Sequence, residues 1–168
     1  IQYPKQLYTV QRGDTLGDIA VKFGTTVNTL WQNNPQLNGN DRIYPGQGLS
    51  ISYVQDKIGK LAVNGYAYPN INRQVLRKTL PYLTYLSVFS YGFQPGGALL
   101  TQNDREIVAT AREFGVQPLM VLTTINAQGQ FSSEQAHRLL NDAAEQRSLT
   151  ESLRRELLAR GYSGLDVD

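Results

Sequence analysis

The chain has 168 residues, enough for one ordinary domain or for a small module joined to part of a larger one. Lys and Arg number 16 against 14 Asp and Glu, a net charge of +2 that gives no indication of a nucleic-acid-binding face. With no Cys and a single His, the sequence excludes disulfides, thiol catalysis and Cys/His zinc sites. We therefore expect chemistry from carboxylates, hydroxyls, amides and aromatic rings, with no metal and no cofactor.

The sequence contains no segment that is expected to cross a membrane. No stretch approaches the roughly 18 apolar residues that a spanning helix needs. Residues 1–5 lack the basic start and the apolar run of a secretion signal, so no signal peptide is expected in this sequence. Aromatic residues are plentiful, and each ring can either pack in a core or stack on a sugar. Neither nucleic acid nor a membrane is expected as a partner.

The first 52 residues are predicted to form two short helices between two strands, at residues 7–10 and 49–51. Thr15 and Asp18 form a capping box that opens the first helix, and Thr26 opens the second. Each helix is followed by a residue that ends it, Gly24 for the first and Pro35 for the second. The predicted order is βααβ. The polar stretch at 53–60 is predicted to be a linker.

This first part resembles the LysM domain, a small carbohydrate-binding module. The resemblance implies binding of N-acetylglucosamine-containing glycans, peptidoglycan or chitin, in a shallow groove between the loop at 13–16 and the loop before the last strand. It is carried by Tyr8 to Leu16, Ile19, Ala20, Phe23, Gly24, Leu30, Asn34, Pro35, Ile43, Pro45 to Gln47, Leu49 and Ile51. The candidate glycan-binding residues are Asp14, Thr15, Leu16, Leu37, Arg42, Ile43, Tyr44 and Pro45.

Two roles remain open for several of these residues. Asp14 and Thr15 can contact the ligand or only cap the first helix, and Ile43 also fits as a core residue. Tyr44 has the strongest individual case for ligand contact, because an N-acetyl sugar needs a flat or aromatic surface for its ring.

From Leu61 onward, predicted strands alternate with predicted helices. Repeated βα units with apolar strands indicate a parallel sheet, either doubly wound or a (βα)8 barrel. No glycine-rich phosphate loop follows the first strand, which weighs against a dinucleotide fold. Four strands are too few to close a barrel. The strands are expected at 61–68, 85–91, 118–124 and 164–168, and the helices at 73–83, at 103–114, after Ser132, and from a capping box of Ser148 and Glu151 to Gly161.

Residues 61–168 resemble the first half of a glycoside hydrolase family 18 barrel, in particular the LysM-bearing spore cortex glycosylases. The fold class is therefore α/β, a βααβ module plus the first four βα units of a (βα)8 barrel. The ending resembles the catalytic pattern D-G-x-D-x-D-x-E, with Asp166 and Asp168 at its two later aspartates and Ser163 in place of its first. The matching segments are Asn64 to Pro69, Phe89 to Phe93 with Gly97, Pro118 to Thr123 with Phe131 and Ser132, and Gly161 to Asp168.

The resemblance implies a retaining hydrolysis in which the 2-acetamido oxygen of the substrate attacks the anomeric carbon. A glutamate would protonate the leaving oxygen, and an adjacent Asp would hold the acetamido group. The sequence ends two positions before that glutamate, so we expect these 168 residues alone to be inactive. Asp166 and Asp168 are the candidate catalytic residues, with both side chains on one face of a strand. Candidates for the sugar site, or equally for barrel filling, are Tyr66, Phe89, Tyr91 and Thr123.

Three functions fit these observations. The first is the N-terminal part of a peptidoglycan-hydrolysing N-acetylglucosaminidase, located outside the cytoplasm in the cell wall or in the spore cortex or coat. The second is a non-catalytic LysM wall-binding protein. The third, a soil or defence chitinase, is less favoured because residues 122–125 replace the S-x-G-G signature of those enzymes.

A half-barrel is expected to leave two strand edges unpaired and an apolar sheet face open. Val63, Val88 and Leu122 are predicted to point inward, to be covered by the missing half-barrel or by a second chain. Without the second half-barrel or a partner chain, the sheet should be marginally stable or prone to self-association. His137 lies on a predicted helix with no second His or Cys to share a metal, so it is not expected to be a ligand.

Overall fold

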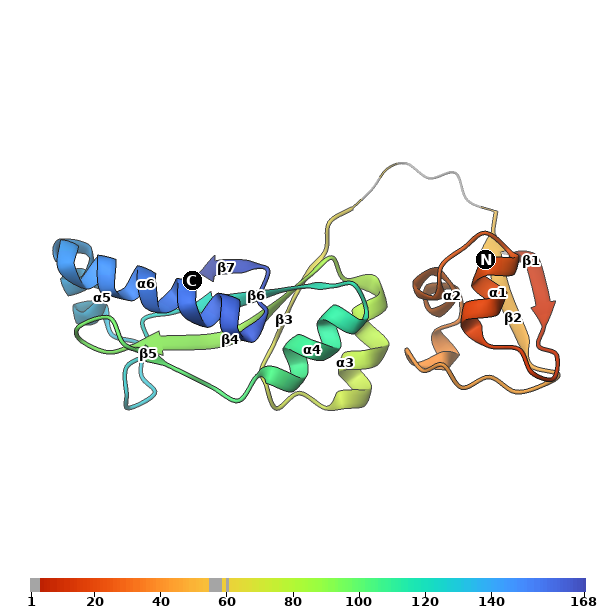
Figure 1. Ribbon diagram of the computed structural model, residues 1–168, viewed down its shortest axis with the longest axis horizontal. Coiled ribbons are helices and arrows are strands. Elements are labelled where there is room, and N and C mark those ends of the chain that lie inside the picture. The colour runs from red at the N-terminus through yellow and green to blue at the C-terminus, as the bar shows by residue number, and fades with distance from the viewer. Residues whose placement is uncertain (1–3, 55–58, 60) are drawn as a thin grey trace. The chain divides into compact units, whose positions relative to one another are not determined.

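The computed structural model describes residues 4–54, 59 and 61–168 (Figure 1). Contacts within the chain define two compact units, one of residues 1–63 with 72–83 and one of residues 64–71 with 84–168. The predicted linker at 53–60 lies largely outside the described residues. None of the helices in the described part of the chain combines the length and the apolar character needed to cross a membrane.

The first unit contains the predicted βααβ arrangement. Strands β1 (Pro4–Thr9) and β2 (Gly48–Tyr53) pair antiparallel, with Tyr8 opposite Leu49. Helices α1 (Leu16–Lys22) and α2 (Val27–Asn33) lie between them in the chain and are followed by the short helix η1 (Pro35–Leu37). The hydroxyls of Thr15 and Thr26 accept hydrogen bonds from the first turns of α1 and α2. The predicted helix starts are therefore confirmed.

A buried asparagine joins α2 to β2. Asn34 is 1% exposed, and its Nδ2 donates to the carbonyl oxygens of Leu30 at 2.8 Å and Ser50 at 2.9 Å. Its Oδ1 accepts from the backbone N–H of Ser50 at 2.8 Å. Because both ends of the amide are satisfied, its burial carries little penalty, and it fixes the chain where α2 ends.

Helix α3 (Arg73–Thr79) also groups with the first unit and is capped by Asn72, whose Oδ1 accepts from the N–H groups of Gln74 and Val75. The sequence predicted one helix over 73–83, but the α-helix ends at Thr79 and continues as the 3₁₀ turn η2 (Leu80–Tyr82). Pro81 explains the change, because it has no N–H with which to continue an α-helix.

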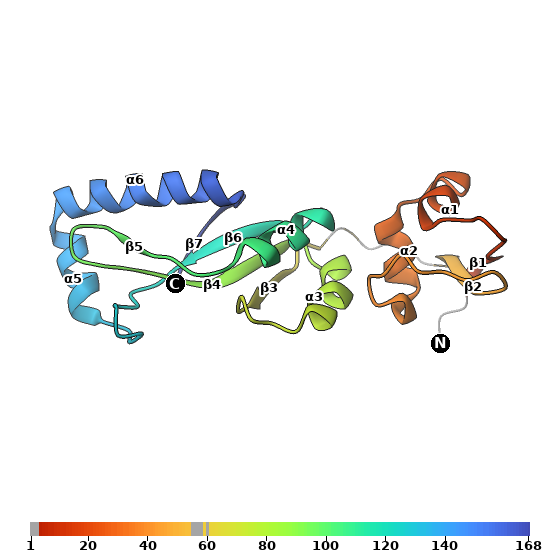
Figure 2. The same ribbon diagram turned by 60° about the horizontal axis from the view of Figure 1, so that its bottom comes forward.

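The second unit is built on a parallel sheet in the order β3 (Asn64–Ala67), β4 (Tyr85–Phe93), β6 (Gln117–Leu122) and β7 (Gly164–Val167) (Figure 2). The parallel pairing confirms the α/β class predicted from the alternating pattern. Helix α4 (Arg105–Glu113) packs on β6 and β4. Helices α5 (Ser133–Asn141) and α6 (Ala143–Arg160) lie between β6 and β7 in the chain.

A short strand, β5 (Leu99–Leu100), pairs antiparallel with the end of β4 and lies beside α6. No strand was predicted between residues 91 and 118. The predicted start of α6 was also wrong. The Asp142 carboxylate caps this helix through the N–H groups of Ala144 and Glu145, so it begins before Ser148. Ser148 instead donates its hydroxyl to the carbonyl oxygen of Gly96 at 2.6 Å.

The core of the second unit contains a buried carboxylate, Asp104, with no exposed surface. It accepts hydrogen bonds from the hydroxyls of Tyr91 and Tyr162, and the Arg160 guanidinium lies 2.7 Å from its Oδ1. Burial and the bond to Asp104 raise the pKa of both phenols, so they remain donors at neutral pH. The cluster ties β4 to the residues that lead into β7.

Candidate functional site

One carboxylate and three polar side chains meet across β3, β4 and β7. Asp166 Oδ2 accepts hydrogen bonds from the hydroxyls of Ser87 at 2.8 Å and Tyr66 at 2.9 Å. Asn64 Nδ2 lies 3.0 Å from the Ser87 hydroxyl. Parallel pairing of the strands brings these residues together although they are far apart in the sequence, and Asn64 and Ser87 lie in the first part of their strands and not at the carboxyl ends.

The charge of this site acts on Tyr66. The hydrogen bond to Asp166 raises the pKa of the Tyr66 phenol, and the negative charges of Asp166 and Asp168 add to the effect. The phenol therefore stays protonated at neutral pH and donates to the carboxylate. Asp168 is exposed, and its backbone N–H donates to the carbonyl oxygen of Leu122 at 3.0 Å. This bond holds Asp168 beside β6.

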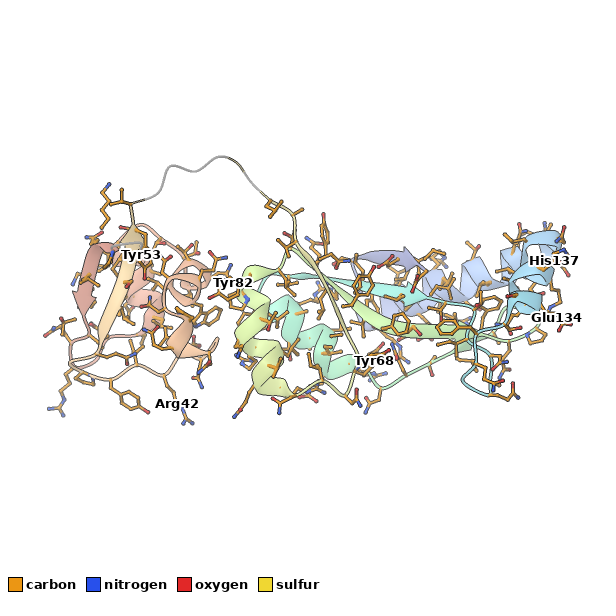
Figure 3. All side chains as sticks on the ribbon, turned by 180° about the vertical axis from the view of Figure 1, so that it is seen from behind. Arg42, Tyr53, Tyr68, Tyr82, Glu134 and His137 are labelled. Atoms are coloured by element: carbon orange, nitrogen blue, oxygen red, sulfur yellow. The ribbon has the colours of Figure 1, made fainter. Side chains whose placement is uncertain are left out.

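An aromatic pocket of about 260 Å³ adjoins Tyr66, lined by Tyr66, Ala67, Tyr68 and Phe89. Tyr68 and Phe89 pack edge to face, with ring centroids 5.4 Å apart and an interplanar angle of 77°. Tyr68, labelled in Figure 3, is 62% exposed. Tyr68 was not among the predicted site residues, although it follows Tyr66 by two positions in a predicted strand, and residues two apart on a strand share a face.

Two of the predicted sugar-site residues lie elsewhere. Tyr91 is fully buried and donates to Asp104 in the core. Thr123 is 2% exposed, and its hydroxyl lies 3.3 Å from both the Ser90 hydroxyl and the carbonyl oxygen of Tyr91. Neither residue lines the aromatic pocket.

The apolar sheet residues also differ from the prediction. Val88 was expected on the open face, but it is fully buried, and it alternates with Ser87, whose hydroxyl reaches Asp166. Successive residues on a strand point to opposite faces, so Val88 lies on the face opposite the carboxylate. Leu122 is likewise buried, at 7% exposed.

His137 lies on the surface of α5, as Figure 3 shows. Its Nε2 is 3.4 Å from Asn141 Nδ2. Across residues 4–54, 59 and 61–168, no group of three His, Asp or Glu side chains converges to hold a metal ion.

In the first unit, three of the predicted glycan-binding residues share an open pocket of about 550 Å³. Leu37, Arg42 and Tyr44 line it together with three amide side chains that were not predicted, Gln36, Asn40 and Gln47. Tyr44 is 65% exposed. Its backbone N–H donates to Gln47 Oε1 at 3.0 Å, which fixes the turn that presents the ring.

The predicted residues of the other loop have structural contacts. Asp14 accepts hydrogen bonds from the backbone N–H of Gln11 at 2.8 Å and from the Tyr8 hydroxyl at 2.7 Å. These bonds, with the nearby charge of Lys22, lower the pKa of Asp14. Thr15 caps α1, and Leu16 is 2% exposed. Leu16 therefore lies in the core and not on the surface.

The remaining two predicted residues flank Tyr44. Ile43 is half-buried and Pro45 is exposed, and neither lines the pocket. The turn they belong to is held against β1, since the N–H of Gly46 donates to the carbonyl oxygen of Val10 at 2.8 Å.

Comparison with known proteins agrees with both parts of this description. Residues 8–52 match the LysM domain. Across 167 residues, 98% of this chain, the sequence is 30% identical to the Bacillus subtilis protein named sporulation-specific glycosylase YdhD, of which the match covers 39%. The crystal structure of the Bacillus cereus spore cortex-lytic enzyme SleL superposes with a TM-score of 0.60 and 26% identity, covering 96% of this chain and 38% of that one.

A chitinase from Chromobacterium violaceum has a similar fold, with a TM-score of 0.55 at 16% identity over 64% of this chain and 35% of that chain. The chain thus combines a LysM domain with part of an α/β domain of this fold. It is homologous to YdhD and SleL over nearly all of its own length, and it spans less than two-fifths of either.

Proposed function

We propose that this chain is the glycan-binding and N-terminal catalytic part of a glycoside hydrolase that acts on N-acetylglucosamine-containing peptidoglycan in the cell wall or spore cortex. The observation that carries the proposal is Asp166, held by Tyr66 and Ser87 beside an aromatic pocket, in a chain that also contains a LysM domain. The names of YdhD and SleL, a glycosylase and a cortex-lytic enzyme, support the same substrate class.

In this proposal the chemistry is substrate-assisted and of the family 18 type. The acetamido oxygen of the bound sugar attacks the anomeric carbon, while Asp168, with Asp166 behind it, orients the acetamido N–H and stabilises the positive oxazolinium that forms. The ring of the sugar packs against Tyr68 and Phe89. In the family 18 scheme a glutamate protonates the leaving oxygen, and these 168 residues, taken without such a residue, are proposed to bind glycan.

The LysM domain holds the enzyme on its insoluble polymer. Tyr44 provides an exposed ring for stacking, and the amides of Gln36, Asn40 and Gln47 provide hydrogen bonds for acetamido and hydroxyl groups. Because sugar recognition releases few counterions, binding should change little with salt.

Co-sedimentation with purified peptidoglycan tests the binding role. Tyr44→Ala should weaken binding about tenfold, since a stacked ring contributes on the order of 1–2 kcal/mol. N-acetylglucosamine oligomers should release the wild-type chain. Val21→Ala, which alters an 82% exposed residue on α1, is the control and should bind normally. Unchanged binding by folded Tyr44→Ala would contradict the assignment of this pocket.

Release of reducing ends from peptidoglycan tests the catalytic role, in a protein that carries these residues together with a complete barrel. Wild-type protein should cleave the glycan, and Asp168→Asn should lose at least about 100-fold in kcat, because it removes charge that the oxazolinium needs. A non-catalytic wall-binding protein, the alternative, would bind the same glycan and release no reducing ends.

A further inference from the structure

A buried serine on β4 lies next to the proposed catalytic carboxylate. Ser87 has no exposed surface, and both of its neighbours in the strand, Leu86 and Val88, are core residues. A hydroxyl buried in such a position is destabilising unless it has a polar partner. Ser87 has two, Asn64 on the neighbouring strand β3 and Asp166 on β7, which lies beyond β6, so it connects β3 with β7.

The distances fix the direction of these hydrogen bonds. Ser87 Oγ is 2.8 Å from Asp166 Oδ2, 3.0 Å from Asn64 Nδ2 and 3.2 Å from Asn64 Oδ1. Serine has one hydroxyl proton to donate, and the carboxylate oxygen is both the nearer acceptor and the charged one. The proton therefore points to Asp166, and Asn64 donates from its amide into the serine oxygen. Each bond in this series polarises the next toward the carboxylate.

Tyr66 donates to the same oxygen of Asp166, but its hydrogen bond is more exposed to water. Its bond is 2.9 Å long, and the tyrosine is 61% exposed, so water competes for both partners. The Ser87 bond is more deeply buried than the Tyr66 bond and is therefore electrostatically stronger. Ser87 thus has the greater influence on the orientation of Asp166.

We propose that Asn64 and Ser87 form a donor pair that fixes the side-chain orientation of Asp166, which makes Ser87 a positioning residue for hydrolysis. The proposal rests on the proposed function for its catalytic consequence. The hydrogen bonds that Asn64 and Ser87 make are present in the structure whether or not the proposed function is correct. Asn64 acts only through Ser87, because it contacts the hydroxyl and has no hydrogen bond to Asp166 among the contacts of the described residues.

The first test is spectroscopic and uses these 168 residues. The ¹³C resonance of the Asp166 carboxyl group, assigned with Asp166→Asn, should move in Ser87→Ala and, by less, in Asn64→Ala. Asn64 is exposed, so its replacement keeps the test valid if Ser87→Ala does not fold. Ser90→Ala, on the same strand with its hydroxyl near Thr123, is the control and should leave the resonance in place. An unmoved resonance in folded Ser87→Ala and Asn64→Ala would overturn the proposal.

The second test is kinetic and uses the protein with a complete barrel. Ser87→Ala should lower kcat about 10–100-fold with little change in KM, the size typical when a partner that orients a reacting group is lost. Asn64→Ala should lower kcat by less, and the double variant should be no worse than Ser87→Ala, because the two residues act in series. Ser87→Thr should restore activity.

The two tests separate the proposals. Additive losses, or a change in KM alone, would overturn the positioning role. A wild-type barrel that cleaves no glycan would overturn the proposed function, and the carboxyl resonance would still decide whether Asn64 and Ser87 orient Asp166.

Discussion

Single polar residues hold the turns of the LysM domain. Asp14 illustrates this, because the sequence left it open as a ligand contact or as a structural residue. Its carboxylate accepts from Gln11 N–H and the Tyr8 hydroxyl, and Lys22 Nζ lies 4.4 Å from the centre of the Tyr8 ring. The structure gives Asp14 a structural role, the closing of the loop between β1 and α1.

This role predicts a specific pH dependence. The pKa of Asp14 is lowered in the folded state, so its contribution to stability is present above the unfolded pKa of about 3.9 and is lost as the pH falls through the lower folded value. Asp14→Asn should be less stable than wild type at pH 7, and the two should converge below about pH 4. Urea denaturation across this range measures the difference.

The matched control for this prediction is Asp41→Asn, because the Asp41 side chain has no hydrogen bond or ion pair among the interactions of the described residues. Its stability should follow that of wild type at every pH. A constant gap between Asp14→Asn and wild type down to pH 2 would show that the charge of Asp14 contributes nothing.

At the scale of elements, one close approach fixes how α6 lies against the β4–β5 hairpin. Gly97 has a φ of +83°, and a Cβ built on it would lie 2.5 Å from the backbone nitrogen of Leu149. The hydroxyl of Ser148 donates to the carbonyl oxygen of Gly96 at the same contact. The hairpin and the helix therefore meet through backbone atoms, which leaves no space for a side chain.

Alanine variants of the neighbouring residues Gly96 and Gly97 distinguish two causes of lost stability, a strained backbone conformation and a clash with α6. Gly96→Ala, at φ +85° with open space around it, should cost about 1 kcal/mol for the left-handed backbone alone. Gly97→Ala has the same conformational cost and also a clash with α6, so it should cost several times more. Equal losses for the two variants in urea denaturation would show that α6 moves freely away from the hairpin.

At the scale of the molecule, the sheet of the second unit has two edges, β3 and β7. On β7, Val167 is 72% exposed and Leu165 is 38% exposed. An unpaired edge that carries apolar side chains is a template for pairing with another strand. The sequence predicted association from two unpaired strand edges and an apolar face, and at the β7 edge the structure exposes two apolar side chains.

The edge predicts self-association of the isolated chain. Sedimentation equilibrium should show a mass that rises with protein concentration, and Val167→Lys should reduce the rise, because a charge on an edge strand opposes pairing. Val21→Lys places the same charge on an equally exposed valine of α1 and should leave association unchanged. A wild-type chain that stays monomeric at all concentrations would contradict this prediction.

The sequence by itself determined the elements whose signals are local. Capping by Thr15 and Thr26, the end of α6 at Gly161, the βααβ order and the alternation that gives a parallel sheet all follow from spacing and turn chemistry within a few residues. Asp166 in β7 and Asp168 just after it were candidates for another reason, the resemblance of the ending to the catalytic pattern of glycoside hydrolase family 18.

Only the tertiary structure decided which side chains meet. Tyr66 and Asp166 are 100 residues apart, and Ser87 and Asp166 are 79 apart, so no local pattern marks Ser87 or Asn64 as part of the site. The sequence also left the burial of some candidates open: Tyr91 was a candidate for the sugar site or for barrel filling and Leu16 a candidate for glycan contact, and both are core residues in the fold. Strand register and packing set these distances, and both depend on contacts between segments that the chain brings together only when it folds.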